Sequence, residues 1–334
     1  MFTLRQYLLA LLDSRGLTRT LGEIDVCRDE QGRPCFSAGN SAAVFRIRLG
    51  GRIRSLRCYL RPMRHLKEIY GQRLLEKELY LHTSPETGVW VDTVLGDWIE
   101  GSTLHETVAQ AAALRDRESL QILVRLFDRL ALALVTDDRA HGDLKPENII
   151  VGDDGTLCPI DFDASYLPAF AGEISPELGT AAYQHPARTA ADFDERIDDY
   201  PAALISTALH ALAENPTLWD RYGSSDGLLY TPQRIASDPA YRETLALFEK
   251  RGMAVQYRIA QLLTAPTLRL FGLAELLAEA VREKPAARSG TEAETPELFV
   301  ENGRWGYRTA ERVVVAPLYD NGFDFTEGLA AVQL

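Results

Sequence analysis

The feature that most constrains this chain is a pair of short polar motifs joined by a predicted β-hairpin. The first motif, His-Gly-Asp-Leu-Lys-Pro-Glu-Asn, occupies residues 141–148, and the second, Asp-Phe-Asp, occupies residues 161–163. Between them, apolar runs flank the turn Gly-Asp-Asp-Gly at residues 152–155, a pattern that predicts two short strands doubling back on each other. We therefore expect the hairpin to bring Asn148 beside Asp161.

The residue types in these two motifs match the needs of phosphoryl transfer. That reaction requires a carboxylate to orient the attacking hydroxyl, a cation on the transferred phosphate, and oxygen ligands for magnesium. Asp143 and Lys145 would supply the carboxylate and the cation, as the candidate catalytic residues. Asn148 and Asp161 would supply the metal ligands, so the cofactor expected here is Mg²⁺.

With these motifs the chain resembles the eukaryotic-type Ser/Thr protein kinases of bacteria, and further matching motifs follow in the family's order. Residues 179–186 (Gly-Thr-Ala-Ala-Tyr-Gln-His-Pro) resemble the end of an activation segment. Asp198, before the apolar run 202–213, resembles the acid that holds the catalytic loop, and residues 98–101 resemble the hinge that meets adenine, with Glu100 as a candidate contact. The resemblance covers residues 22 to 283 and implies an ATP-dependent enzyme with a protein substrate.

The fold that this resemblance implies is α+β and bilobal, with a small β-rich N-lobe and a helical C-lobe. We expect the N-lobe at residues 22–101 and the C-lobe at residues 102–282, after an N-terminal helix within residues 1–21 that packs on the kinase domain. Residues 283–296 have the composition of a linker, and residues 297–334 are predicted to form a small C-terminal β unit.

The segment at residues 37–44 stands where such kinases carry their glycine-rich phosphate loop. Of the usual glycines Gly39 is present, and Val44 follows as the residue expected to pack on adenine. Small residues at the other positions still let backbone N–H groups approach a phosphate, although less freely than glycine does.

Arg57 stands where related kinases carry a lysine that contacts the phosphates. A predicted helix over residues 64–74 offers Glu68 as the carboxylate that would pair with this cation, although the charge of Glu68 also fits an ordinary exposed helix position. Arg57 need not be specific to this site, because the chain has 31 arginines and five lysines. Lys145 is nevertheless kept.

Two other positions depart from the family pattern. Gly142 replaces the arginine that reads a phosphorylated activation segment in many kinases, so we predict that phosphorylation of Ser165, Ser175 or Thr180 does not gate activity. Asp163 stands where glycine is usual, and we expect it to restrict rearrangement of the segment.

Composition narrows the possible partners. The chain has 334 residues, is 46% apolar and carries a formal charge of −12 without a basic stripe, which argues against nucleic acid and anionic membranes as partners. Its four cysteines are scattered, and no segment has the length of a membrane span. A cytoplasmic location is the simplest interpretation.

The C-terminal unit resembles a WG repeat. The matching segments are Gly-Arg-Trp-Gly-Tyr at 303–307, Pro-Leu-Tyr-Asp at 317–320 and Phe-Thr-Glu-Gly-Leu at 325–329. Such repeats stabilise one another by stacking, so we expect a longer parent protein with more repeats, and a protein partner for this region.

Three functions remain open at this point. The first is an active Ser/Thr protein kinase, and the second is a pseudokinase or nucleotide-binding interaction module in which Arg57 and the altered phosphate loop impair turnover. The third is a small-molecule phosphotransferase, because His-Gly-Asp also opens the catalytic loop of those enzymes. Lys145 and the segment at residues 179–186 favour the protein kinase.

Overall fold

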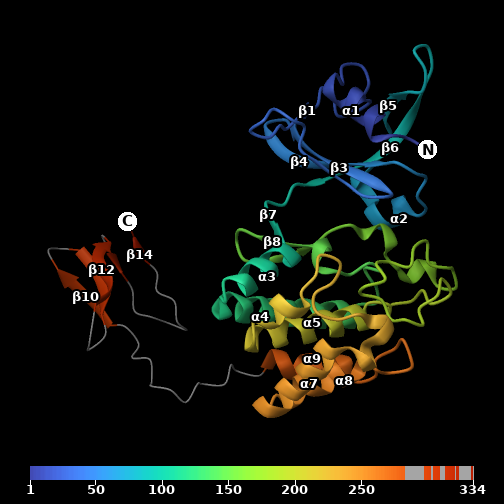
Figure 1. Ribbon diagram of the computed structural model, residues 1–334. Coiled ribbons are helices and arrows are strands. Elements are labelled where there is room, and N and C mark those ends of the chain that lie inside the picture. The colour runs from blue at the N-terminus through green and yellow to red at the C-terminus, as the bar shows by residue number, and fades with distance from the viewer. Residues whose placement is uncertain (283–296, 302–303, 309–312, 320, 323–331, 334) are drawn as a thin grey trace. The chain divides into compact units, whose positions relative to one another are not determined.

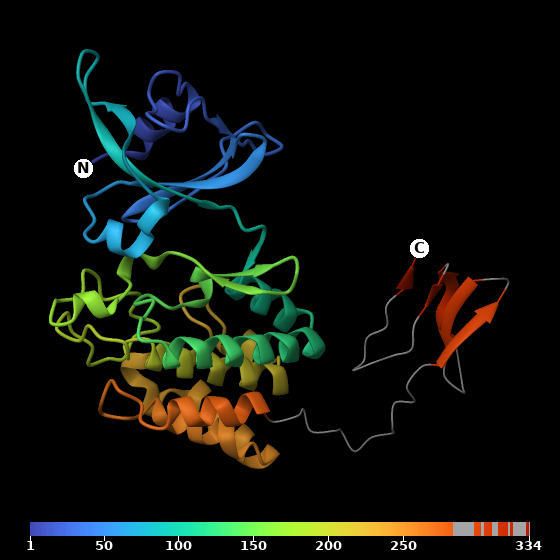
Figure 2. The same ribbon diagram turned by 180° about the vertical axis from the view of Figure 1, so that it is seen from behind.

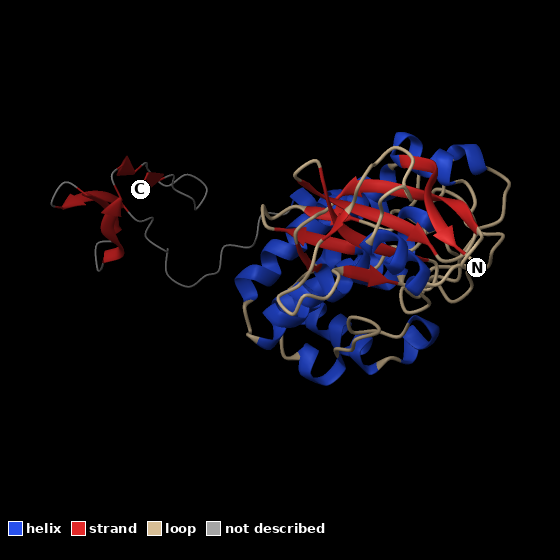
Figure 3. Cartoon of the chain, turned by 90° about the horizontal axis from the view of Figure 1, so that it is seen from above, coloured by secondary structure: helices blue, strands red, loops and turns tan. Residues whose placement is uncertain are grey.

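Alternating apolar residues in the first hundred positions form a curled antiparallel sheet. The computed structural model describes residues 1–282, 297–301, 304–308, 313–319, 321–322 and 332–333. The sheet has the strand order β1-β3-β4-β6-β5, and β2 pairs with β3. Its strands are β1 (Asp25–Val26), β2 (Phe36–Ala38), β3 (Ala42–Leu49), β4 (Arg52–Tyr59), β5 (Leu74–His82) and β6 (Gly88–Asp97). Figure 1 shows the strands as one twisted layer above the helices of residues 104–282, and Figure 3 shows the same strands from above.

The N-terminal helix α1 (Leu4–Leu12) packs on this sheet. Thr3 and Gln6 form a capping box at its start, which satisfies two backbone N–H groups that the helix itself leaves free. Tyr7 and Leu11 are buried against the sheet. The helix lies within the residues where the sequence predicts it, and Leu12 at its end is exposed.

Helix α2 (Leu66–Tyr70) is much shorter than the predicted helix over residues 64–74. It gives way to the short 3-10 helix Gly71–Arg73, and β5 begins at Leu74. Gly71 has a φ of 53°, a left-handed value that favours glycine and ends the α-helix. The predicted length is therefore wrong.

The helical part buries its apolar residues around α4 and α5. Its α-helices are α3 (Leu104–Ala113), α4 (Arg117–Thr136), α5 (Asp199–Glu214), α6 (Leu218–Tyr222), α7 (Pro239–Arg251), α8 (Ala254–Leu262) and α9 (Leu273–Arg282). Leu120, Phe127 and Val135 of α4 are buried against apolar side chains of α5 such as Leu209. Figure 2 shows α4 and α5 running side by side beneath the segment at residues 141–163. The apolar run at residues 202–213 lies in α5, directly after Asp198, as the resemblance implies.

A second, three-stranded sheet carries the predicted hairpin. It consists of β7 (Gly101–Thr103), β8 (Ile149–Gly152) and β9 (Leu157–Pro159), with β8 in the middle. The β8–β9 hairpin confirms the prediction from the sequence. Short 3-10 helices at Pro146–Asn148 and Phe162–Ala164 stand immediately before and shortly after it.

The chain divides into two compact units, Met1–Arg282 and Glu283–Leu334. In the second unit, β10 (Glu297–Glu301), β11 (Arg304–Arg308) and β12 (Val313–Tyr319) form an antiparallel sheet, and β13 (Asn321–Gly322) pairs with β14 (Val332–Gln333). The predicted linker and the segment at 325–329 lie outside the described residues. Within the described residues, no helix combines the length and apolar character that a membrane span requires.

Candidate active site

A buried carboxylate accepts hydrogen bonds from the backbone of the loop at residues 141–148. Asp198 accepts hydrogen bonds from the backbone N–H groups of His141 and Gly142, the latter at 3.0 Å. Burial raises the pKa of Asp198, while these hydrogen bonds act in the opposite direction. Asp198 therefore has the place in the site that the resemblance implies.

Gly142, directly before Asp143, stands in a place that has no room for a side chain. Its φ is +80°, and a Cβ at this position would lie 2.0 Å from the carbonyl oxygen of Ala164. The loop and the segment after the Asp-Phe-Asp motif thus approach each other too closely for any side chain. Arg188 contacts the same place from another direction, since its buried guanidinium donates to the carbonyl of Gly142 at 3.0 Å.

Asp143, Lys145 and Thr180 form a compact polar group. The backbone N–H of Thr180 donates to Oδ1 of Asp143 at 2.6 Å. Nζ of Lys145 lies 3.2 Å from Oδ2 of Asp143 and donates to Oγ1 of Thr180 at 2.8 Å. Both charged side chains remain partly open to solvent, at 18% for Asp143 and 22% for Lys145. A carboxylate and a cation are thereby placed next to each other at an accessible surface.

Asn148 and Asp161 offer oxygen ligands that suit magnesium. The side-chain nitrogen of Asn148 donates to the carbonyl oxygen and to Oδ2 of Asp143, at 2.9 and 3.2 Å, which leaves its amide oxygen without a protein partner among the described residues. The carbonyl of Asn148 also accepts the N–H of Ile160, so the hairpin keeps the two residues close in space. In the described part of the chain, no group of three or more His, Cys, Asp and Glu side chains is arranged to hold a metal ion by itself. Two protein ligands completed by nucleotide phosphates are typical of magnesium, so the residues fit that ion.

Arg57 lies at the centre of a second polar group. Its guanidinium pairs with Asp161 and with Asp163, the latter through Nε at 3.1 Å as well as through the fork. The other oxygen of Asp163 accepts the hydroxyl groups of Tyr70 at 2.6 Å and Tyr59 at 3.1 Å. Burial lowers the pKa of Arg57, but the two carboxylates outweigh it and hold that pKa above its usual value. Arg57 therefore stays positively charged while it contacts both carboxylates.

The structure does not bring Glu68 to Arg57, contrary to the expectation from the resemblance. Glu68 is exposed on the short helix α2, and the carboxylate that takes its expected place is Asp163. The physical reason is the length of α2, which ends at Tyr70 and presents a tyrosine hydroxyl to the site instead of a carboxylate. Glu78, on β5, is buried and holds the loop at residues 19–21 by hydrogen bonds to its backbone.

The remaining predicted nucleotide contacts lie on the sheet and the hinge. Gly39 is in the turn between β2 and β3, where its N–H donates to the carbonyl of Ala42. Val44 is directly opposite Arg57 in the register of β3 and β4. Glu100 lies between β6 and β7, and its carboxylate is engaged by Arg46 and by the indole of Trp98.

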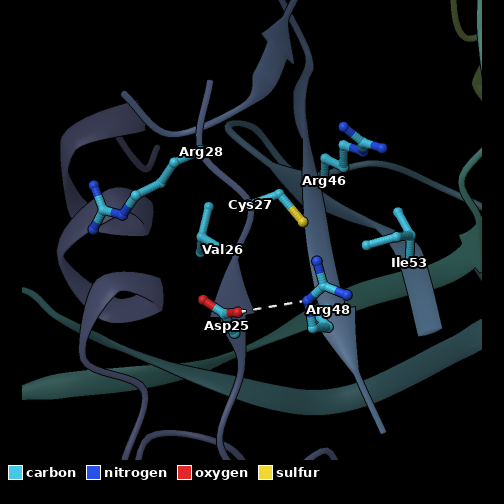
Figure 4. A pocket seen from close by; sticks show the side chains of 7 residues that line it. All are labelled: Asp25, Val26, Cys27, Arg28, Arg46, Arg48 and Ile53. Carbon is cyan, nitrogen blue, oxygen red and sulfur yellow. Dashed lines mark ion pairs between the residues drawn. The ribbon is translucent and has the colours of Figure 1, made fainter. Parts of the chain in front are cut away.

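A shallow pocket lies elsewhere, at the β1 edge of the sheet. Figure 4 shows the side chains that line it: Asp25, Val26, Cys27, Arg28, Arg46, Arg48 and Ile53. Arg48 pairs with Asp25 at 3.8 Å, and Arg46 is already engaged by Glu100. The pocket shares no residue with the Asp143 or Arg57 groups, so we do not assign it to the candidate site.

The segment at residues 165–186, which resembles an activation segment, contacts the sheet part through two carboxylates. Glu177 pairs with Arg61, and Glu173 lies 2.9 Å from His65. Ser165 and Ser175 are both buried, and the hydroxyl of Ser175 donates to the carbonyl of Glu177. The segment is therefore fixed by its own carboxylates.

Sequence reasoning missed several residues of the site. Thr180 was considered only as a phosphorylation site, although a threonine after glycine at the end of the segment was a usable signal. No local pattern predicts the roles of Tyr59, Tyr70 and Arg188, because these roles depend on contacts with residues far away in the chain. Asp163 was noticed only as a missing glycine. Its φ is negative, and Asp161 is the residue in the left-handed region, at 66°.

Comparison with known proteins points to kinases. No protein-family model matches the chain. The serine/threonine-protein kinase PknL of Mycobacterium tuberculosis is 28% identical over 219 residues, which cover 60% of this chain and 52% of that kinase. CBL-interacting protein kinase 17 of Oryza sativa subsp. japonica is 28% identical over 172 residues, covering 49% of this chain and 35% of that protein. The chain thus spans about half or less of these distant homologues, and they support a kinase-like domain.

Proposed function

We propose that residues 22–282 form a protein kinase domain that transfers the γ-phosphate of ATP to a serine or threonine hydroxyl of a protein. The observation that carries the proposal is the placement of the Asp143 carboxylate, fixed by the N–H of Thr180 and lying 3.2 Å from the Lys145 ammonium. A carboxylate held in this way can orient a hydroxyl, and the adjacent cation can neutralise a phosphate oxygen.

Each residue has a separate task in this proposal. Asp143 accepts the hydrogen bond of the attacking hydroxyl, and Lys145 stabilises the charge on the transferred group. Asn148 and Asp161 would hold Mg²⁺, which when bound neutralises phosphate charge. Arg57 faces the same segment from β4 and would meet the phosphates nearer the nucleoside. Gly39, Val44 and Glu100 would border the nucleotide.

The direct test is incubation of the whole chain with γ-labelled ATP and magnesium, with and without generic protein substrates. We expect label on serine or threonine after acid hydrolysis of the protein fraction. Label that appears only on small hydroxyl compounds added in parallel would contradict a protein kinase and support a small-molecule phosphotransferase. The contact between Lys145 and Thr180 favours the protein kinase, because Thr180 belongs to the segment that resembles the substrate-side loop of protein kinases.

One observation favours a pseudokinase as the second candidate. Arg57 pairs with Asp161, so a metal must compete with a guanidinium for this ligand. A pseudokinase would bind nucleotide, with or without magnesium, and transfer no phosphate. Calorimetric titration of ATP beside the labelling assay separates the two functions.

We also propose that phosphorylation of the activation segment does not switch this domain on. The pairs of Glu173 with His65 and Glu177 with Arg61 already attach the segment by negative charges, which is the role of a phosphate elsewhere. Phosphatase treatment should therefore leave the rate unchanged within about twofold, a range set by exposed ion pairs. A large loss of rate would contradict this.

The C-terminal unit and the location of the protein complete the proposal. We propose that residues 297–334 belong to a WG-repeat region that binds a protein partner, and that the protein works in the cytoplasm. The first is tested by pull-down with and without this region, and the second by fractionation of cells.

A further inference from the structure

Asp163 is the most completely bonded side chain of the candidate site. One of its oxygens accepts Nε of Arg57 at 3.1 Å, and the other accepts the hydroxyl groups of Tyr70 and Tyr59. The residue is 4% exposed. A buried carboxylate is costly unless it is paired and hydrogen-bonded, and here every requirement is met by three residues of the sheet part.

This arrangement determines where the Arg57 guanidinium can be. Arginine has a planar fork, so contacts through both Nε and a terminal nitrogen fix its orientation as well as its position. The side chain is 13% exposed, and its terminal nitrogen also contacts Asp161. A cation held in this way can be presented to phosphate oxygens without further ordering.

We propose that Asp163 is the positioning residue for Arg57 in nucleotide binding, and that it does the work expected of Glu68. The inference rests on the proposed function only in taking the ligand to be magnesium-ATP. The carboxylate for the cation comes here from the segment after the metal ligand, and helix α2 contributes the hydroxyl of Tyr70 in its place.

The arrangement has a consequence for the metal ligand. Arg57 contacts two carboxylates, so Asp163 would still hold it if Asp161 bound the metal. Without the charge of Asp163, Arg57 would be held by Asp161 alone and would compete with the ion more strongly. Asp163 should therefore favour the binding of magnesium-ATP, and this effect should disappear when Arg57 is replaced.

The test is a double-mutant cycle of Asp163→Asn and Arg57→Gln, read as the Kd of magnesium-ATP by calorimetry. Both substitutions keep hydrogen-bonding groups and remove charge. We expect Asp163→Asn to weaken binding about tenfold in the natural background and less than about twofold beside Arg57→Gln, as coupled partners do. Equal losses in both backgrounds, or no loss in the natural one, would overturn the inference.

Two further variants guard against a merely structural effect. Glu68→Gln, on the exposed residue, should leave the Kd unchanged, and a tenfold loss there would return the role to helix α2. Tyr70→Phe removes a single hydroxyl from Asp163 and should weaken binding about threefold, in the range of one hydrogen bond. An unchanged Kd in this variant would count against Asp163.

The outcome is separable from that of the proposed function. If the effects of Asp163→Asn and Arg57→Gln on the Kd are coupled but no phosphate is transferred, the positioning role of Asp163 is supported and the kinase activity is contradicted. If phosphate is transferred but the two effects are independent, the kinase activity is supported and the positioning role is contradicted. If the natural chain binds no magnesium-ATP, the role of Asp163 is refuted.

Discussion

The site contains two polar groups of similar composition but different construction. The loop group consists of Asp143, Lys145, Asn148 and Thr180, and the arginine group consists of Arg57, Tyr59, Tyr70, Asp161 and Asp163. Three members of the loop group come from one motif, and its charges are partly open to solvent. In the arginine group, Arg57 and Asp163 are 106 positions apart in the chain and more buried, at 13% and 4% exposed, whereas Asp161 is 40% exposed.

This difference separates two kinds of requirement. In the proposed function the loop group meets a substrate, and its charges are accessible and depend little on each other for stability. The arginine group joins the sheet to the catalytic segments, so its charges depend on each other, since removing one partner leaves the other buried without compensation. We therefore expect mutations in the first group to affect the reaction, and mutations in the second to affect stability as well.

The largest stability effect should come from Arg57→Ala. It leaves the buried Asp163 carboxylate without its cation, which costs about 3–5 kcal/mol of unfolding free energy. The matched change Lys145→Ala removes a more exposed cation and should cost about 1 kcal/mol or less. Urea unfolding of both variants measures the two costs, and equal values would end the distinction between the groups.

A smaller effect is expected for the backbone under the loop group. Gly142→Ala places a Cβ 2.0 Å from the carbonyl oxygen of Ala164 at a φ of +80°, whereas Gly155→Ala meets nothing within 4 Å at a φ of +78°. The second change should cost about 1 kcal/mol from its backbone conformation alone. The first should cost about 2–3 kcal/mol and also reduce phosphate transfer. If the two variants unfold at the same urea concentration, the close approach of the loop to Ala164 is not real.

The smallest effect should appear as a pH dependence beneath the loop group. Burial raises the pKa of Asp199 from 3.8 to about 6, while the N–H of Leu270 donates to it at 3.2 Å. The folded chain then holds this proton more tightly than the unfolded chain, so stability present below pH 3.8 is lost as the pH rises through 6. The shift corresponds to about 3 kcal/mol in full, of which about 2 kcal/mol should be lost between pH 4 and 7, and Asp199→Asn should remove this loss. Urea unfolding at pH values of about 4 and 7 measures the stability of the natural chain and of Asp199→Asn. The same change in stability with pH in both proteins would contradict the raised pKa of Asp199.

The sequence predicted the loop group more completely than the arginine group for a physical reason. A hairpin and a catalytic loop are local, so the spacing of Asp143, Lys145 and Asn148 already determines their neighbours. The partner of Arg57 depends on where α2 ends, and the left-handed Gly71 ends it after Tyr70. The sequence therefore predicts Glu68 as the carboxylate that pairs with Arg57, whereas Asp163 makes this contact in the structure.

The same limit applies to residues that contact the backbone. Gly142 could be read as a missing arginine, but only the position of Ala164 shows why no side chain fits there. The sequence thus predicts which chemical groups are present, and the tertiary structure decides which of them meet.

The central claim is that Asp143 performs phosphate transfer while Asp161 serves the nucleotide-bound metal. Its most direct test is the single-turnover rate of transfer by Asp143→Asn at saturating magnesium-ATP, with the Kd measured on the same sample. We predict a rate lower by about 10²–10⁴-fold, the contribution of a positioned general base, and a Kd within about twofold of the natural chain. A rate close to that of the natural chain, or a rate that falls only because binding is lost, would contradict the account.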